Sequence, residues 1–307
     1  MKVLSLFDGI SCGMLALKRA GIPVENYDAF EIDKYAIKVS ENNYPNIVHH
    51  GNVFDGDFTQ FKGYDLLLGG SPCTYWSIAK KCRETTSDGM GFKLFMEYVR
   101  ALKESECKYF LYENNYSIHQ NIKDEISKYL GVQPIMINSA LVSGQNRKRC
   151  YWTNIPNVIQ PDDKGIMLAD ILEDGLPWQD KSYCMTAQYQ KAIFSNTLER
   201  KQRTMVAVRI CQIGKGGQGQ RIYSVRGKSI AMTANGGGTG GKTGLYKIDL
   251  PDGDYIIRKL TPVEAERLQT LPDNYTAGIS NTQRYKCIGN GWTVDVIAHI
   301  LRGLKNK

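Results

Sequence analysis

The sequence lacks the patterns that mark several common classes of protein. Its eight cysteines and four histidines include no CxxC and no HxxxH spacing, so we expect no metal site. No stretch approaches 18 consecutive apolar residues, which predicts no membrane-spanning helix. Residues 1–7 lack the long apolar region and the cleavage site of a signal peptide. We therefore expect a cytoplasmic protein, in which an even number of cysteines is coincidental.

The chain has enough apolar sequence for a sizeable core, and its charge is unevenly distributed. Hydrophobic residues make up 42% of the 307 residues, which suits one large domain or two modest ones. The net charge is +8, and residues 181–247 contain twelve Lys or Arg but a single acid, Glu199. This segment therefore carries +11, which leaves −3 on the remainder. A basic segment on a nearly neutral body indicates a polyanionic partner.

Strands and helices alternate through the first half of the chain. The predicted strands cover residues 3–7, 27–32, 47–49, 64–68, 108–112, 132–138 and 150–153. The predicted helices cover residues 14–20, 34–42, 92–102 and 118–130. This alternation predicts an α/β fold with a Rossmann-like, mostly parallel sheet and helices on both faces.

The pattern changes near residue 154. From there to residue 257 helical periodicity fades, and glycines cluster at 214–219 and 236–241. A helix start then follows, with Thr261 as N-cap, Pro262 at the first helical position and Glu264 at the third, and residues 294–304 form a last amphipathic helix. We expect residues 1–154 and 258–307 to form one domain, and residues 155–257 to form a smaller, loop-rich, β-containing domain that recognises the target.

Basic side chains stand near both glycine clusters of this second domain. Glycine lets a backbone approach a phosphate closely, so these side chains are candidate contacts to a nucleic acid. The candidates are Arg221, Arg226, Lys228 and Lys242.

One loop carries the strongest sign of chemistry. An apolar strand ends in Gly69 and Gly70, and Pro72 then stiffens the chain just before Cys73. A thiol at the carboxyl end of a parallel strand lies where open α/β sheets bind their ligands. Cys73 is therefore a candidate nucleophile, and the alternative is a buried structural cysteine.

Other strand ends carry residues that could serve this cysteine. The turn at residues 8–13 precedes a helix, whose N-terminal N–H groups can bind a cofactor. Glu31 ends the second strand about 20 residues after this turn, where an acid commonly accepts ribose hydroxyls. Glu113 ends another strand, and Arg147 and Arg149 follow. Arginine lowers the pKa of a neighbouring thiol, and an acid beside an arginine pair can hold or protonate a heterocycle.

Together these motifs resemble those of the DNA (cytosine-5)-methyltransferases that use S-adenosylmethionine. The resemblance covers almost the whole chain and keeps the family's motif order. Its clearest motifs are Pro72–Cys73, Glu113–Asn114, Gln145-x-Arg147-x-Arg149, the helix motif at 258–269 and Gly289–Asn290 before the last helix. The turn at residues 7–13 and Glu31 bring the number of motifs to seven. One such motif is a weak signal, whereas seven in the family's order are a specific one.

The resemblance implies S-adenosylmethionine as cofactor, S-adenosylhomocysteine as product, and no metal. Glu31 would take the ribose hydroxyls, and Ile32 would pack on the adenine. The full set of implied cofactor contacts is Phe7, Asp8, Gly9, Ile10, Gly13, Glu31, Ile32, Asn52, Val53, Pro72, Leu94, Asn290, Gly291 and Trp292.

The resemblance also implies a mechanism at a cytosine that has left the duplex. Cys73 would attack C6 of the ring, and Glu113 would hold the N3 and amino edge and supply a proton. Arg149, together with Arg147, would stabilise the activated ring. C5 would then take the methyl group, and loss of the C5 proton would release Cys73. Gln145 would contact the DNA.

Three positions depart from the family pattern. Asn52 stands where Asp usually accepts from the adenine amino group, Gly291 stands where Ser is common, and Asn115 replaces Val after the Glu–Asn pair. An amide oxygen still accepts a hydrogen bond, so the first change predicts weaker cofactor binding. With the bulky ring of Trp292 nearby, these departures make a nonstandard sulfonium cofactor a secondary hypothesis.

We therefore expect a monomeric enzyme that methylates C5 of a flipped cytosine in a specific sequence of double-stranded DNA. It would be associated with the nucleoid, either beside a cognate restriction endonuclease or as an orphan or phage enzyme. Two alternatives stay open. A tRNA cytosine-5 methyltransferase shares the Pro–Cys and Glu–Asn motifs, but the Cys-Phe-Thr sequence of that branch is absent here. A catalytically silent DNA-binding relative would not be expected to keep Cys73 and Glu113.

Overall fold

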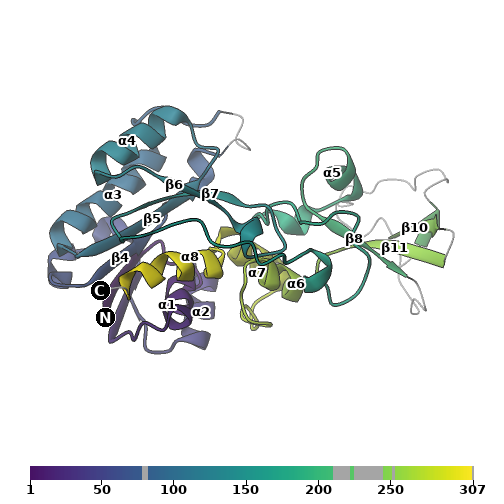
Figure 1. The fold of residues 1–307 in the computed structure, drawn as a ribbon, viewed down its shortest axis with the longest axis horizontal. Coiled ribbons are helices and arrows are strands. Elements are labelled where there is room, and N and C mark those ends of the chain that lie inside the picture. Colours follow the sequence, from purple (N-terminus) through teal and green to yellow (C-terminus); the bar gives the residue numbers. More distant parts are fainter. Residues whose placement is uncertain (78–81, 210–221, 225–244, 251–252, 306–307) are drawn as a thin grey trace. The chain divides into compact units, whose positions relative to one another are not determined.

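The computed structural model describes residues 1–77, 82–209, 222–224, 245–250 and 253–305. These residues form two compact units (Figure 1). The first unit contains residues 1–139, 148–162 and 291–307, and the second contains residues 140–147 and 163–290. Residues 258–290, which we assigned from the sequence to the catalytic domain, thus cluster with the second unit. The functional division of the chain stays a prediction.

The first unit is built on a seven-stranded sheet in the order β3-β2-β1-β4-β5-β7-β6. Its strands are β1 (Lys2–Leu6), β2 (Asn26–Phe30), β3 (Val48–His49), β4 (Leu66–Gly69), β5 (Tyr109–Asn115), β6 (Ile135–Asn138) and β7 (Lys148–Thr153). Strands β1 to β5 pair in parallel, and β7 runs antiparallel to both of its neighbours. The predicted Rossmann-like, mostly parallel α/β sheet is confirmed.

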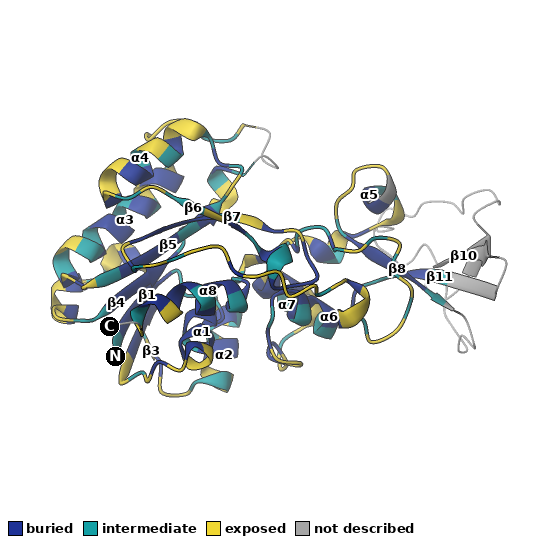
Figure 2. Ribbon diagram, viewed as in Figure 1, coloured by how far each residue is buried: buried dark blue, intermediate teal, exposed yellow. Residues whose placement is uncertain are grey.

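Helices cover both faces of this sheet. Helices α3 (Met90–Ser105) and α4 (Gln120–Leu130) lie on one face, and α1 (Cys12–Ala20), α2 (Lys34–Asn43) and α8 (Val294–Leu301) lie on the other (Figure 1). The apolar stripe of α8 explains its place, because it packs against α1 and buries its apolar side chains. Strand β4 is covered on both sides, and Leu66–Leu68 are completely buried (Figure 2). No described helix is long and apolar enough to cross a membrane.

The second unit contains a four-stranded sheet in the order β8-β11-β10-β9. Its strands are β8 (Met205–Arg209), β9 (Ile222–Ser224), β10 (Leu245–Leu250) and β11 (Gly253–Lys259), and its helices are α5 (Phe194–Leu198), α6 (Pro262–Leu268) and α7 (Asn281–Asn290). Helix α6 begins with the predicted capping box: the Glu264 N–H donates to Thr261 Oγ1 at 3.1 Å, and the Thr261 N–H donates to Glu264 Oε2 at 2.8 Å. The four candidate phosphate contacts and both glycine clusters lie outside the described residues.

Helix α7 corrects the sequence-based prediction of a turn at residues 289–293. Gly289 and Asn290 form the last turn of this helix, and the bend begins only at Gly291. The helix is mostly polar, so it lacks the apolar stripe by which helices are predicted. Gly289 is required by close packing, because a Cβ there would lie 2.2 Å from the backbone nitrogen of Ala187.

Candidate active site

The predicted catalytic and cofactor residues of the first unit follow the carboxyl ends of neighbouring strands. Phe7 follows β1, Glu31 follows β2, Cys73 follows β4 and Glu113 lies near the end of β5. Because β1, β2, β4 and β5 are parallel and adjacent, these ends meet at one edge of the sheet. The sheet therefore gathers residues that are distant in sequence.

The turn after β1 has an unusual backbone. Phe7, Gly9 and Ser11 all have left-handed φ angles, of 57°, 62° and 57°. Non-glycine residues adopt this region at an energetic cost, so the surrounding structure must hold the turn in place. Such strain is common where a backbone is shaped around a ligand.

Asp8 supplies much of that support. Its carboxylate accepts hydrogen bonds from the hydroxyls of Ser5 at 2.6 Å, Ser11 at 2.5 Å and Tyr27 at 2.7 Å. Burial raises the pKa of Asp8, against the lowering effect of these hydroxyls. The carboxylate therefore fixes the turn from inside, and its predicted direct contact with the cofactor stays a prediction.

Glu31 ties the first two strand ends together. Its Oε2 accepts the N–H of Gly9 at 2.8 Å, and its Oε1 accepts the N–H groups of Ile32 and Asp33 at 2.8 Å each. Burial raises the pKa of this carboxyl group, and the three backbone donors oppose that effect. Three bonds leave acceptor capacity for a further donor, since a carboxylate accepts about four.

Cys73 differs from the buried cysteines of the chain. It is exposed, at the start of a one-turn 3₁₀ helix (Cys73–Tyr75) directly after Pro72. Burial raises the pKa of Cys107 to about 11 and also raises the pKa of Cys150, so both are poor nucleophiles. No described cysteine forms a disulfide, and of these thiols only Cys73 and Cys82 are exposed. The alternative of a buried structural cysteine is therefore wrong for Cys73.

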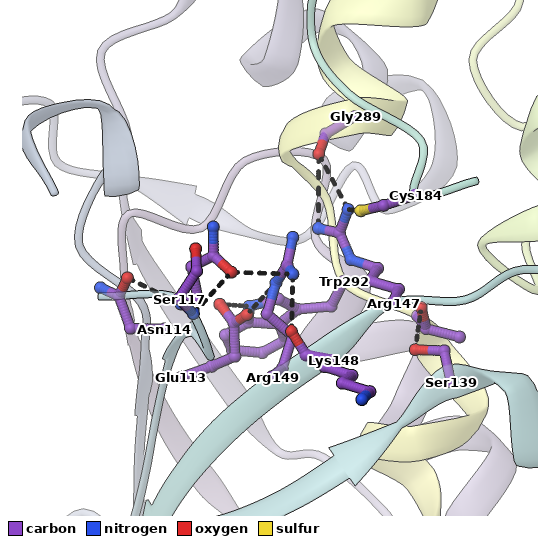
Figure 3. A network of polar contacts seen from close by, with 12 residues as sticks. Glu113, Asn114, Ser117, Ser139, Arg147, Lys148, Arg149, Cys184, Gly289 and Trp292 are labelled. Atoms are coloured by element: carbon purple, nitrogen blue, oxygen red, sulfur yellow. Dashed lines mark hydrogen bonds and ion pairs between the residues drawn. The ribbon is translucent and has the colours of Figure 1, made fainter. Parts of the chain in front are cut away.

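Glu113 is held by two donors from different parts of the first unit (Figure 3). Arg149 Nε lies 2.9 Å from Glu113 Oε1, and Trp292 Nε1 donates to Glu113 Oε2 at 3.1 Å. The side chains of Glu113 and Arg149 are only 12% and 11% exposed. The register explains the ion pair: Asn115 lies opposite Arg149 in the β5–β7 ladder, which makes Glu113 and Arg149 diagonal neighbours on one face.

A second, buried network joins β5 to the cysteine loop. Ser71 Oγ and Tyr112 Oη lie 2.6 Å apart, and Asn114 Nδ2 donates to the Ser71 carbonyl at 3.2 Å and to Tyr112 Oη at 3.3 Å. All three side chains are buried. Sequence reasoning missed Ser71 and Tyr112, because a serine before a proline and a tyrosine in a strand carry no signal in one sequence.

Comparison with known proteins agrees with this geometry. Residues 1–306 match the family described as C-5 cytosine-specific DNA methylase. The chain belongs to this family. It is 32% identical to the type II methyltransferase M.HhaI of Haemophilus parahaemolyticus, over 98% of this chain and 93% of that protein. It is 25% identical to the orphan methyltransferase M.SPRI of Bacillus phage SPR, over 99% of this chain and 97% of that protein.

Solved structures show the same fold. The methyltransferase EhMeth of Entamoeba histolytica superposes with a TM-score of 0.64 and 18% identity, over 99% of this chain and 97% of that chain. A variant of DNMT2 from Spodoptera frugiperda gives a TM-score of 0.62 and 18% identity, over 99% of both chains. This cytosine methylase is thus an enzyme of the Rossmann-like methyltransferase fold, and its family implies S-adenosylmethionine as cofactor and DNA as substrate.

The residues present fit the nucleoside part of this cofactor. The Glu31 carboxylate can accept ribose hydroxyls, and the apolar side chain of Ile32 beside it is 73% exposed, as a surface for a base requires. Asn52 is exposed, and its Oδ1 accepts the Phe54 N–H at 3.2 Å. The second lone pair of this oxygen can accept the adenine amino group. Val53 is buried and Leu94 half-buried, so both shape the core beneath this edge. The described residues contain no group of three or more His, Cys, Asp or Glu that could hold a metal ion.

Arg147 and Gln145 each have contacts with residues of the second unit. Arg147 is buried, and its guanidinium donates to the carbonyls of Met185 at 2.9 Å and Gly289 at 3.3 Å. Gln145 is completely buried and donates to the Leu268 carbonyl at 2.6 Å. These contacts hold both side chains in place. The contact of Gln145 with DNA and the role of Arg147 at the ring stay predictions.

Proposed function

We propose that this methylase transfers a methyl group from S-adenosylmethionine to C5 of a cytosine extruded from a specific sequence of duplex DNA, through a covalent bond between Cys73 and C6. One observation carries the proposal. Asn114 links the loop of the exposed Cys73 thiol to β5, and on β5 the carboxylate of Glu113 is held by Arg149 and Trp292. A thiol and a carboxyl group are thus fixed at the ends of two adjacent strands.

The thiol is needed because C5 of cytosine is a weak nucleophile. When the Cys73 thiolate forms a bond with C6, the C5–C6 double bond opens and its electron pair becomes available at C5. The bound cofactor supplies an electrophilic methyl group. A base then removes the C5 proton, the S–C6 bond breaks with return of its electrons to sulfur, and the ring regains its double bond.

Glu113 and Arg149 would stabilise the charge that develops on the cytosine ring. Glu113 would hold the N3 and amino edge and deliver a proton to N3 as electron density rises there. Arg149, which is fixed against Glu113, would stabilise the same charge through O2 or a nearby phosphate. This division of roles follows from the family resemblance, and the ion pair supports it.

We further propose duplex DNA as the partner, bound by the enzyme as a monomer. The segment of residues 181–247, with twelve basic residues and one acid, would supply the phosphate contacts. Such binding is expected to weaken steeply as the salt concentration rises.

Methyl-group labelling tests this function. The purified protein is incubated with methyl-labelled S-adenosylmethionine and either genomic duplex DNA or total tRNA, and the products are digested to nucleosides. We expect label in 5-methyldeoxycytidine from DNA, and bisulfite sequencing of that DNA then gives the recognition site. Label in tRNA alone would overturn the DNA assignment. Specific DNA binding with no label in either acceptor would overturn the catalytic one.

A further inference from the structure

We infer that Trp292 is a positioning residue for the reaction: its indole N–H fixes the carboxylate of Glu113 and couples that carboxylate to the cofactor-binding helix α1. The inference rests on the proposed function of Glu113. From the sequence, Trp292 was expected only to border the cofactor, and the structure assigns it a contact with the acid as well.

The first observation is the two-point attachment of the carboxylate. Trp292 Nε1 donates to Oε2 at 3.1 Å, while Arg149 Nε lies 2.9 Å from Oε1. The two donors come from segments far apart in the sequence, one from β7 and one from the segment before α8. With one donor on each oxygen, rotation of the carboxylate about its Cγ–Cδ bond breaks both bonds. The plane of Glu113 is therefore set before a substrate arrives.

The second observation is what surrounds the ring. A Cβ built on Gly13, in the first turn of α1, would lie 3.7 Å from Trp292 Cζ3. A Cβ built on Gly70, in the loop that leads to Cys73, would lie 3.1 Å from Glu113 Oε2 and 3.5 Å from Trp292 Nε1. One edge of the indole thus faces the cofactor-binding helix, and the other edge binds the acid beneath the nucleophile loop.

The third observation is that the scaffold holds Trp292 independently of Glu113. The next residue, Thr293, is buried, and its Oγ1 accepts a hydrogen bond from Ser139 Oγ at 2.9 Å. The Thr293 carbonyl also accepts the N–H of Val296 at 3.1 Å at the start of α8. The indole therefore projects from an anchored backbone, as a positioning group requires.

The indole N–H is one of several groups that act on the Glu113 carboxylate. Among the described residues, Arg149 faces Glu113 in an ion pair, and Tyr112 and Cys150 interact with it electrostatically. Loss of the indole N–H therefore removes one of the two donors that hold the two carboxylate oxygens in place.

Two variants separate the donor from the ring. Trp292→Phe keeps an aromatic ring without the N–H, and Trp292→Gln keeps an N–H donor without the ring. Trp152→Phe is the matched control, because it removes a hydrogen bond of 2.9 Å from an indole N–H in β7 to Ser127 Oγ. Each variant is measured for cofactor binding, for DNA binding, and for the single-turnover rate of methyl transfer.

We expect Trp292→Phe to lower the single-turnover rate about tenfold or more, as for loss of one hydrogen bond to a charged group. The affinity for the cofactor should stay close to that of the wild type, because the aromatic ring is kept. Trp292→Gln should recover part of the rate, even if the protein is less stable, because it keeps an N–H donor. Trp152→Phe should leave the rate per folded molecule unchanged.

A wild-type single-turnover rate in Trp292→Phe would overturn the inference. So would equal losses of rate in Trp292→Phe and Trp152→Phe, or equal losses in Trp292→Phe and Trp292→Gln, because either result indicates a merely structural role. Glu113→Gln separates this inference from the proposed function. If Glu113→Gln still transfers methyl groups, the proposed role of the acid fails, whereas an inactive Glu113→Gln beside a fully active Trp292→Phe overturns the inference about Trp292 alone.

Discussion

The side-chain amide of Asn114 donates a hydrogen bond to the backbone carbonyl of Ser71 at 3.2 Å. Ser71 lies two residues before Cys73, and Asn114 directly follows Glu113, so this bond joins the loop of the nucleophile to the strand of the acid. Both residues are buried, where water does not compete for the bond. The separation of the sulfur from the carboxylate is therefore set by the β4–β5 pairing and by this contact.

The Tyr112 hydroxyl completes that link, and Tyr112→Phe tests it. The change leaves the buried Ser71 hydroxyl without its 2.6 Å partner, which costs about 1–3 kcal/mol of unfolding free energy. It also loosens the cysteine loop, so kcat should fall. Urea unfolding and methyl-transfer assays measure the two effects.

Tyr98→Phe is the control for Tyr112→Phe. Tyr98 is equally buried, and its hydroxyl donates to the Leu67 carbonyl at 3.3 Å, away from the loop. We expect Tyr98→Phe to lose stability without a change in kcat. Equal effects of the two variants on kcat would contradict a special role for Tyr112.

If Glu31 takes the ribose hydroxyls as proposed, cofactor binding depends on pH. Burial raises the pKa of this carboxyl group, and hydroxyl donors prefer the ionised form. The affinity for S-adenosylhomocysteine should be complete above the raised pKa and should fall as the pH drops through it. Calorimetric titration from neutral pH downward into the acidic range measures this dependence.

Glu31→Gln should bind the same ligand more weakly at neutral pH, by about 1.5–3 kcal/mol, and with a flatter pH dependence. The exposed Glu25 lies before β2, at its opposite end, and Glu25→Gln should behave like wild type. Because burial also raises the pKa of Asp8, a small remaining slope in Glu31→Gln is assigned to Asp8. An unchanged affinity in Glu31→Gln would show that this acid does not hold the ribose.

Glu264 is expected to be a strong determinant of stability in the second unit. It is completely buried, and Arg258 donates to its two oxygens at 2.7 and 2.8 Å. Glu264→Gln leaves the guanidinium with one charged partner, the exposed Asp174, and also weakens the cap of α6. The loss should be about 3–5 kcal/mol, measured by urea unfolding.

An exposed ion pair between the last turn of α6 and the segment after it gives the contrast. Arg267 and Asp273 are 2.6 Å apart, but their side chains are 32% and 48% exposed. Asp273→Asn should therefore cost less than about 1 kcal/mol. A loss in Asp273→Asn as large as that in Glu264→Gln would mean that burial does not decide the strength of these pairs.

The parts of the fold that follow from local sequence were predictable. Periodicity and capping residues predicted the alternating elements and the start of α6 at Thr261, because each depends on residues close together in the chain. Helix α7 was missed because its polar sequence carries no apolar stripe. The structure groups residues 258–290 with the second unit, and local sequence patterns do not show this grouping because contacts between distant segments decide it.

The same distinction holds at the site. The places of Cys73, Glu113 and Glu31 at strand ends could be predicted, because each follows or ends an apolar run, whereas their roles stay predictions. The bond from Trp292 to Glu113 joins residues 179 positions apart, and the contact of Ser71 with Tyr112 needs the β4–β5 pairing, so neither leaves a mark on a single sequence. Arg147 and Arg149 look equivalent in the motif, yet their partners differ: Arg149 pairs with Glu113, whereas Arg147 donates to carbonyls of the second unit.

The covalent step through Cys73 is the central claim, and trapping tests it most directly. A random-sequence duplex that contains 5-fluorodeoxycytidine is incubated with the enzyme and S-adenosylmethionine, because fluorine at C5 cannot leave as a proton does and the adduct persists. We expect a denaturant-resistant protein–DNA complex that requires the cofactor, maps to Cys73 by peptide mass spectrometry, survives in Cys82→Ser and is absent in Cys73→Ser. Trapping that persists in Cys73→Ser, or an adduct on another residue, would contradict the assignment of Cys73 as the nucleophile.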